Sequence, residues 1–184
     1  LSEGNHTVVV RVTDEGRLWS EDAVTFYVRF IRPSVRILEP TNGTVIETDS
    51  ITICWNATPG SFDIAKVEVR LDGGDWIDVT GRNNYTFTDL SEGEHVVEIR
   101  VVDAKGLVKE AEATFYVEFI PPSVRIIEPA NGTAVETDSI TVTWNLTRGS
   151  FDIVKVEIRL DGGDWIDVTG RTDYTFTGLS EGEH

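Results

Sequence analysis

The chain has 184 residues, of which 40% are hydrophobic, and a formal net charge of −16. A charge of this sign repels nucleic-acid phosphates, and no run approaches the roughly 20 apolar residues of a membrane span, so we expect neither nucleic-acid binding nor a membrane span in this segment. Met and Gln do not occur and Cys occurs once, which is typical of hyperthermophile proteins and favours a thermophilic, archaeal source.

An internal repeat with a period of 89 residues organises the chain. Residues 34–95 and 123–184 align without a gap, and 49 of these 62 positions are identical. The same offset aligns residues 1–33 with residues 90–122. We therefore expect the C-terminal strands of one module in residues 1–33, a complete module in residues 34–122, and the N-terminal strands of a further module in residues 123–184.

Residues 1–33 contain two segments in which every second residue is apolar, the period of a strand with one buried face. The apolar positions that share this face are Val8, Val10, Val12, Phe26 and Val28. Two strands alone have no sheet that covers such a row. We therefore expect this face to pack between modules or between subunits.

The complete module repeats the alternating pattern several times. Residues 50–56 and 67–71 alternate strictly, and the second segment leads into the turn at residues 72–75, where glycines supply the positive φ angles of a tight hairpin. No helical period occurs. Further alternating segments cover residues 76–79, 85–87, 95–101 and 111–117. About seven short strands per module predict an all-β fold in which two antiparallel sheets form a sandwich.

Residues 123–184 repeat the strands that begin the module. Ile140, Val142 and Trp144 occupy the inward positions of the strand that corresponds to residues 50–56. The last two strands of the module have no counterpart in this segment, so we expect an open groove that strands like those of residues 1–33 fit. Further copies of the repeat, in a longer chain or in separate subunits, are therefore the expected partners, joined head to tail.

Four stretches of the complete module resemble a known family. They read SITICWN at residues 50–56, KVEVRLDGGDWIDVT at 66–80, YTFTDLSEGEH at 85–95 and VVEIRVVDAKG at 96–106. This sequence is similar to fibronectin type III modules and to the related immunoglobulin-like modules of bacterial and archaeal surface proteins. The resemblance implies tandem Ig-like or fibronectin type III-like antiparallel β-sandwich modules. The sequence departs from the fibronectin pattern at the corner, where His95 stands in place of the usual Tyr.

Asn-x-Thr tripeptides are more frequent than the composition explains, since six of the seven Asn residues begin one. All lie at turns or outward strand positions of the predicted fold. Turn chemistry is the alternative explanation, but the excess favours N-linked glycans and an extracellular or cell-surface location. The predicted glycosylation sites are Asn5, Asn42, Asn56, Asn84, Asn131 and Asn145.

Nothing in the sequence indicates catalysis, a cofactor or a metal site. His6, His95 and His184 occupy one equivalent corner position, which favours a packing role over a catalytic one. Cys54 is Thr143 in the next copy, so it is not an obligatory disulfide partner or metal ligand. The acidic turns at residues 72–78 and 161–167 match no calcium loop and are better explained as solvated hairpins.

These observations predict a structural, non-catalytic repeat unit of an extracellular filament, pilus-like thread or cell-surface stalk. Two alternatives stay open at this point. One is a set of accessory spacer modules in a large secreted enzyme. The other is an adhesin or carbohydrate-binding array, in which Trp76 and Trp165 would form an exposed platform for sugar rings rather than pack at the edge of the sandwich.

Overall fold

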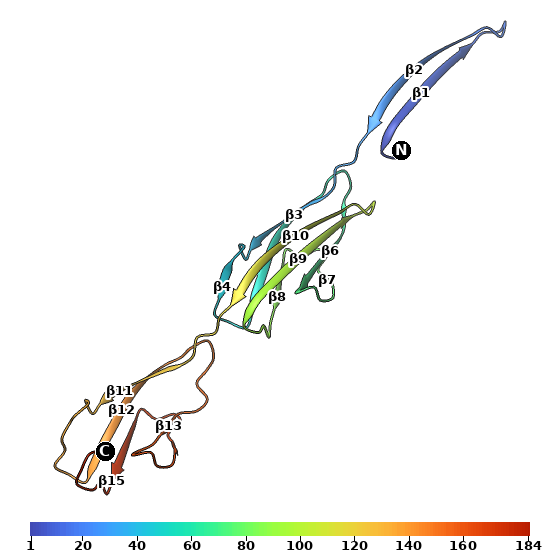
Figure 1. Cartoon of the computed structure of the whole chain (residues 1–184). Helices are drawn as coiled ribbons and strands as arrows, with labels where there is room; N and C mark the ends of the chain where they lie inside the picture. Colours follow the sequence, from blue (N-terminus) through green and yellow to red (C-terminus); the bar gives the residue numbers. More distant parts are fainter. The chain divides into compact units, whose positions relative to one another are not determined.

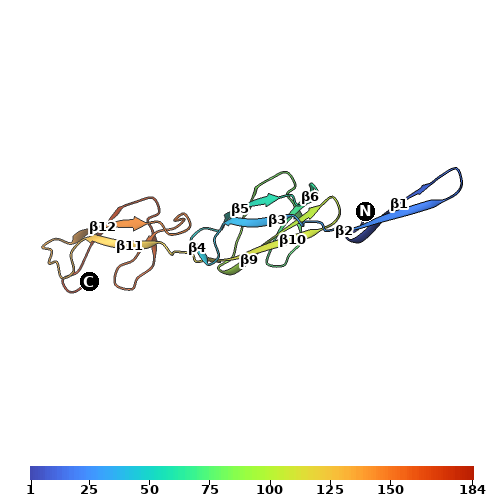
Figure 2. The same cartoon turned by 90° about the horizontal axis from the view of Figure 1, so that it is seen from above.

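A computed structural model describes all residues, 1–184, and consists of β-strands without helices. No helix long and apolar enough to cross a membrane is therefore present. The strands, most of which are labelled in Figures 1 and 2, are β1 (Gly4–Thr13), β2 (Trp19–Val28), β3 (Ser34–Glu39), β4 (Thr44–Ile46), β5 (Ile51–Thr58), β6 (Ile64–Leu71), β7 (Ile77–Asp78), β8 (Asn84–Phe87), β9 (Gly93–Asp103), β10 (Val108–Val117), β11 (Ser123–Glu128), β12 (Ser139–Thr147), β13 (Glu157–Ile158), β14 (Ile166–Asp167) and β15 (Asp173–Thr177).

The chain divides into two compact units. The first contains residues 1–44, 51–88 and 94–115, and the second contains residues 45–50, 89–93 and 116–184. The boundary passes through β10 and does not follow the 89-residue repeat. The assignment of module limits made from the sequence therefore stays a prediction.

Strands β1 and β2 form a two-stranded antiparallel hairpin, drawn in blue in Figure 1. Pairing is unbroken from Gly4 opposite Val28 to Thr13 opposite Trp19. At the turn, the amide of Asp14 donates a hydrogen bond of 2.9 Å to the carbonyl oxygen of Leu18. Because side chains alternate along each strand, this register places the predicted apolar row on one face of the hairpin.

A β-sandwich follows the hairpin. One sheet has the strand order β3-β5-β8 and the other has the order β4-β10-β9-β6-β7. Strand positions that alternate in the sequence alternate in burial, because one face of each sheet lies against the core. The side chains with at most 1% exposure include Ile53, Val69, Val97, Ile99, Val101 and Phe115. The predicted all-β sandwich is confirmed.

A type I′ turn connects β6 to the segment that contains β7. Asp72 and Gly73 have φ angles of 50° and 69°, and the amide of Gly74 donates a hydrogen bond of 2.9 Å to the carbonyl oxygen of Leu71. The same turn recurs at Asp161, where φ is 49°. The glycines were expected to supply the left-handed backbone, but the first left-handed residue of each turn is Asp, a residue that tolerates this conformation.

Residues 123–184 contain a three-stranded sheet of order β11-β12-β15 and a two-stranded ribbon, β13–β14. The first sheet reproduces β3-β5-β8 at the expected offset of 89 residues. By contrast, β13 has two residues, whereas its counterpart β6 has eight. Strand β6 is hydrogen-bonded to β9 along its length, from Ile64 to Leu71. Strand β13 pairs only with β14, so the second sheet is not formed here.

Candidate functional site

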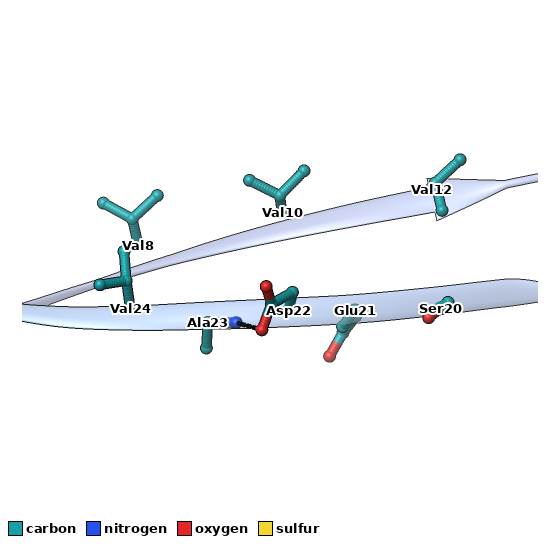
Figure 3. Close-up of a pocket in the computed structure, with 8 residues that line it drawn as sticks. All are labelled: Val8, Val10, Val12, Ser20, Glu21, Asp22, Ala23 and Val24. Carbon is teal, nitrogen blue, oxygen red and sulfur yellow. Dashed lines mark hydrogen bonds between the residues drawn. The ribbon is translucent and has the colours of Figure 1, made fainter.

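The hairpin β1–β2 presents a largely apolar face, on which Asp22 lies opposite Val10. In Figure 3, Val8, Val10 and Val12 point to the same side of β1, and Val24 points to that side from β2. These four side chains are between 48% and 67% exposed. Exposed apolar rows of this kind are unusual on a protein surface, and the packing role predicted for this row stays a prediction.

The equivalent face of β9–β10 is buried. Val10 corresponds to Ile99, which is fully buried, and Phe26, which is 38% exposed, corresponds to Phe115, which is also fully buried. Val28 corresponds to Val117, whose exposed fraction is 1%. The sequence therefore keeps the core-forming side chains of the module in a hairpin whose own residues do not cover them.

Residues 123–184 present a second open face. Trp144 is buried, but Ile140 and Val142 are only half-buried, and the indole nitrogen of Trp144 is buried without a hydrogen-bond partner. Ile158 is half-buried, whereas its counterpart Val69 is fully buried. A buried donor without a partner is costly, which is consistent with an incomplete core. The packing role predicted for these residues stays a prediction.

Charged side chains of β6 and β9 form a network on the outer face of the sandwich. Arg100 donates hydrogen bonds from Nε and Nη2 to Oε2 of Glu68, at 2.9 and 2.7 Å, and Lys66 Nζ lies 2.5 Å from Oε1 of Glu68. Arg70 binds both carboxylate oxygens of Glu98 at 2.7 Å. The Lys66 and Arg100 contacts lower the pKa of Glu68. The network ties β6 to β9 across their pairing.

The two tryptophans named as a possible sugar platform have different surroundings. The guanidinium groups of Arg70 and Arg100 lie 4.4 and 4.3 Å from the ring centroid of Trp76, which is half-buried. Trp165 has one such contact, with Arg159 at 4.4 Å, and is 57% exposed. Trp76 thus packs on the sheet beside two cations, as the edge-packing interpretation expected, and Trp165 is the more open of the pair.

The corner histidines make hydrogen bonds and packing contacts with nearby residues of the same segment. His95 Nδ1 lies 2.7 Å from Oδ2 of Asp72, and its ring stacks on Phe115 with centroids 5.4 Å apart. His184 repeats the first contact, at 2.6 Å from Oδ2 of Asp161. The hydrogen bond that Asp161 accepts from His184, together with the one that the Ser180 carbonyl accepts, raises the pKa of His184. His6 contacts the Ser2 carbonyl at 2.7 Å.

All six Asn residues of the predicted glycosylation set are exposed. Asn56 and Asn145 lie on outward positions of β5 and β12, opposite Arg36 and Arg125. Asn42 also has a structural contact, because its Oδ1 accepts a hydrogen bond of 2.8 Å from the amide of Thr114. That hydrogen bond involves the side-chain oxygen of Asn42. It does not involve the side-chain amide nitrogen, which is the atom to which a glycan attaches. Glycosylation stays a prediction.

The acidic turns serve as hydrogen-bond acceptors. Oδ1 of Asp78 accepts a hydrogen bond of 2.9 Å from the amide of Thr80, which lowers the pKa of Asp78. Asp72 Oδ1 accepts one of 2.8 Å from the amide of Val96. No group of three or more His, Cys, Asp or Glu side chains has a metal-binding arrangement. Cys54 is a half-buried free thiol.

One repeated contact was not predicted from the sequence. The amide of Ile31 donates a hydrogen bond of 2.8 Å to Oγ of Ser61, and the amide of Ser61 donates one of 2.9 Å to the Ile31 carbonyl. Ile120 and Ser150 form the same pair of bonds at 2.8 Å. We refer to each pair as a linker clamp. Its signal was the Gly-Ser-Phe tripeptide, which recurs at the 89-residue offset.

The fold and the repeated strand faces define a tandem Ig-like β-sandwich protein. The model of the bacterial Ig domain matches residues 33–99 and 122–184, which together exceed two thirds of the chain. The chain therefore belongs to the bacterial Ig domain family. No curated protein matches it.

Two solved structures illustrate the similarity. The fibronectin(III)-like modules of Clostridium thermocellum CbhA share 19% identity with a TM-score of 0.41, over 46% of this chain and 97% of that chain. A tetra-tandem repeat in the extending region of a large adhesion protein shares 17% identity with a TM-score of 0.33. That match covers 97% of this chain and 49% of the adhesion-protein chain, so the present sequence spans about half of it.

Proposed function

We propose that this chain is a structural, non-catalytic repeat unit of an extracellular filament, pilus-like thread or cell-surface stalk, in which neighbouring units are joined head to tail. In each joint, the apolar face of β1–β2 completes the open sandwich of residues 123–184 in the next unit. The observation that carries this proposal is the change in exposure between equivalent side chains, from 67% at Val10 to complete burial at Ile99.

The complete module supplies the template for the joint. Strand β6 pairs with β9, and β9 pairs with β10, so a hairpin fills one half of a sheet whose other half is β6–β7. The short ribbon β13–β14 corresponds to β6–β7 and has no such hairpin beside it. Each aliphatic side chain that becomes fully buried contributes about 1.5–3 kcal/mol, and several do so here. The joint is therefore expected to be durable.

The two faces are different surfaces, and this difference determines the kind of assembly. A contact between unlike surfaces is heterologous, and repetition of a heterologous contact that does not close gives a fibre. Strand addition at a sheet edge also supplies main-chain hydrogen bonds, which are independent of side-chain identity. Both properties suit a load-bearing thread or stalk.

The exposed Asn-x-Thr sites support an extracellular location, because N-linked glycans are added to chains that leave the cytosol. Mass spectrometry of peptides that contain Asn42 and Asn56 from native material tests this part of the proposal. We expect a glycan mass on at least one of them. Unmodified Asn at all six sites would remove the argument for an exterior location.

Electron microscopy and sedimentation velocity of the 184-residue chain test the joint itself. We expect concentration-dependent oligomers and unbranched fibres, and we expect Val10→Asp to abolish both because it places a second carboxylate in the buried face, opposite Asp22. Val9→Asp is the matched control, because Val9 lies on the opposite face of the same strand. A monodisperse monomer at all concentrations, or equal effects of the two substitutions, would disprove the proposed joint.

A carbohydrate-binding function is the second candidate, favoured only by the exposure of Trp165. An exposed indole ring stacks on sugar rings through its face. Titration calorimetry with soluble oligosaccharides, comparing the wild type with Trp165→Ala, tests this candidate. Binding that disappears with Trp165→Ala would support it, and absence of heat from a broad set of oligosaccharides would count against it.

A further inference from the structure

Two of the Asn-x-Thr tripeptides in the complete module lie within β-strands. Strand β5 contains the tripeptide at residues 56–58, and β8 contains the one at residues 84–86. The first pairs residue for residue with residues 34–36 of β3, and the second pairs in the same way with residues 52–54 of β5. The main chain of both tripeptides is therefore part of an antiparallel sheet.

The threonine hydroxyl groups of these tripeptides are bound across the same strand pairs. Oγ1 of Thr58 lies 2.6 Å from Oγ of Ser34, and Oγ1 of Thr86 lies 2.8 Å from Oγ1 of Thr52. The acceptor pattern Asn-x-Ser/Thr admits two residues whose shared feature is a hydroxyl group, so the enzyme that adds a glycan must contact this group. In the folded module, each hydroxyl already has a partner on the next strand.

The middle residue of each tripeptide anchors it to the sandwich. Because side chains alternate along a strand, the Asn and the Thr share the outer face while the residue between them points toward the core. Ala57 and Tyr85 are both half-buried, and the rings of Tyr85 and Phe87 meet edge to face with centroids 5.0 Å apart. A tripeptide that leaves the sheet therefore loses core packing as well as main-chain hydrogen bonds.

The asparagine side chains, by contrast, are open to solvent. Asn56 and Asn84 are both exposed on the outer face. Carrying a glycan needs only an exposed amide nitrogen, whereas receiving one needs access to the whole tripeptide. The folded sandwich meets the first requirement, and the pairing of the tripeptides opposes the second.

We propose that Asn56 and Asn84 accept N-linked glycans only while the chain is unfolded, so that glycan transfer precedes closure of the β3-β5-β8 sheet. The substrate of the transferring enzyme is then the extended polypeptide on its way out of the cytosol. A site that is unmodified when the sheet closes stays unmodified. The inference rests on the glycans of the proposed extracellular function and adds the stage at which they are attached.

Glycan transfer in vitro to the folded chain and to its own tryptic peptides tests this order. Trypsin cleaves after Lys and Arg, so the digest contains Asn56 in the peptide 37–66 and Asn84 in the peptide 83–100, both without a sheet. The reagents are a purified oligosaccharyltransferase and its lipid-linked oligosaccharide, and mass spectrometry locates the glycan. We expect both peptides to be modified at least about a hundredfold faster than the folded chain at equal concentration, because a folded chain opens rarely.

Two variants relate the rate in the intact chain to unfolding. Ile99→Ala removes fully buried methyl groups, and we expect it to speed transfer to the intact chain by at least about tenfold, because the open state becomes more populated. Val10→Ala is the matched control, since that side chain is 67% exposed, and we expect the rate of the wild type. Circular dichroism checks that both variants remain folded.

The possible results separate this inference from the proposed function. Transfer to Asn56 and Asn84 of the folded wild type at the rate of the peptides would overturn the inference and leave the glycans in place. An Ile99→Ala variant no faster than the wild type would also overturn it, since transfer would then not pass through an open chain. If neither the peptides nor the intact chain were modified, the glycan part of the proposed function would fail together with the inference.

Discussion

The hairpins β1–β2 and β9–β10 carry similar inward side chains, apart from Asp22 in place of Ala111, but have opposite environments. Val8, Val10 and Val12 of β1 are exposed, whereas Val97, Ile99 and Val101 of β9 are fully buried. Strand β9 is paired with β6 on its second edge, and no strand pairs with the second edge of β1. Whether these inward side chains are buried therefore depends on the strands and the second sheet around the hairpin, and not on the sequence of the hairpin alone. The proposed joint would supply such a sheet to the β1–β2 hairpin.

The largest expected effect comes from shortening one side chain in each hairpin. Ile99→Ala removes fully buried methyl groups and should lower the free energy of unfolding by about 2–5 kcal/mol. In the unassembled chain, Val10→Ala should change it by less than about 0.5 kcal/mol, because that side chain is in water. Urea denaturation of both variants at a dilution that prevents association measures the difference. Equal losses would show that the two environments do not differ.

The polar network gives the next largest effect. Glu68→Gln removes the carboxylate that Lys66 and Arg100 share, and should cost about 1–3 kcal/mol. Because the pKa of Glu68 is lowered in the folded state, its stabilisation is present above the unfolded-state pKa and is lost as pH falls through the folded-state value. Stability measured at descending pH should therefore fall more steeply in the wild type than in Glu68→Gln. Parallel pH profiles would contradict this assignment.

A change in the linker clamp is expected to have a more local effect, confined to the contact between Ile31 and Ser61. A Cβ atom at Gly60 would lie 2.1 Å from the carbonyl oxygen of Ile31, so Gly60→Ala must break the Ile31–Ser61 hydrogen bonds. The expected cost is about 1–3 kcal/mol for two bonds, confined to the clamp. Hydrogen exchange at the amides of Ile31 and Ser61 should accelerate while exchange in β9 stays unchanged. Unaltered exchange at both amides would rule out the clamp.

The smallest expected effect concerns the corner histidine of the open segment. Asp161→Asn removes the carboxylate that raises the pKa of His184, so that pKa should fall toward the ordinary histidine range. A group whose pKa is raised on folding stabilises below its unfolded-state pKa, and this contribution is lost as pH rises through the folded-state value. NMR titration of the His184 ring protons measures the shift. An unchanged titration would contradict the role of Asp161.

Much of the fold could be predicted because two signals can be read directly from the sequence. Strand alternation is visible among neighbouring residues, and the repeat is visible as identical residues 89 positions apart. The alternation around Trp55 predicted β5 and its buried face, and the 89-residue offset identified which positions are equivalent. The short β13 did not follow, since the length of a strand depends on its hydrogen-bonding neighbours. The contacts of Arg70 and Arg100 with Trp76, and the clamp at Ser61, also join residues that no local pattern connects.

Disulfide cross-linking tests the head-to-tail joint most directly. Val69 and Ile99 are cross-strand partners in the complete module, so the repeat places Val10 of one copy opposite Ile158 of the next. Cysteines at such positions are close enough to form a disulfide. The variant Val10→Cys with Ile158→Cys is made with Cys54→Thr, a change that position 143 already carries. Val9→Cys with Ile158→Cys is the control, because Val9 faces the other way.

On oxidation, we expect the Val10→Cys and Ile158→Cys variant to give a ladder of cross-linked dimers, trimers and longer species on a non-reducing gel, and the Val9 control to remain largely monomeric. Cross-links confined to single chains, or a ladder no stronger than that of the control, would contradict the completion of residues 123–184 by the β1–β2 hairpin of another copy.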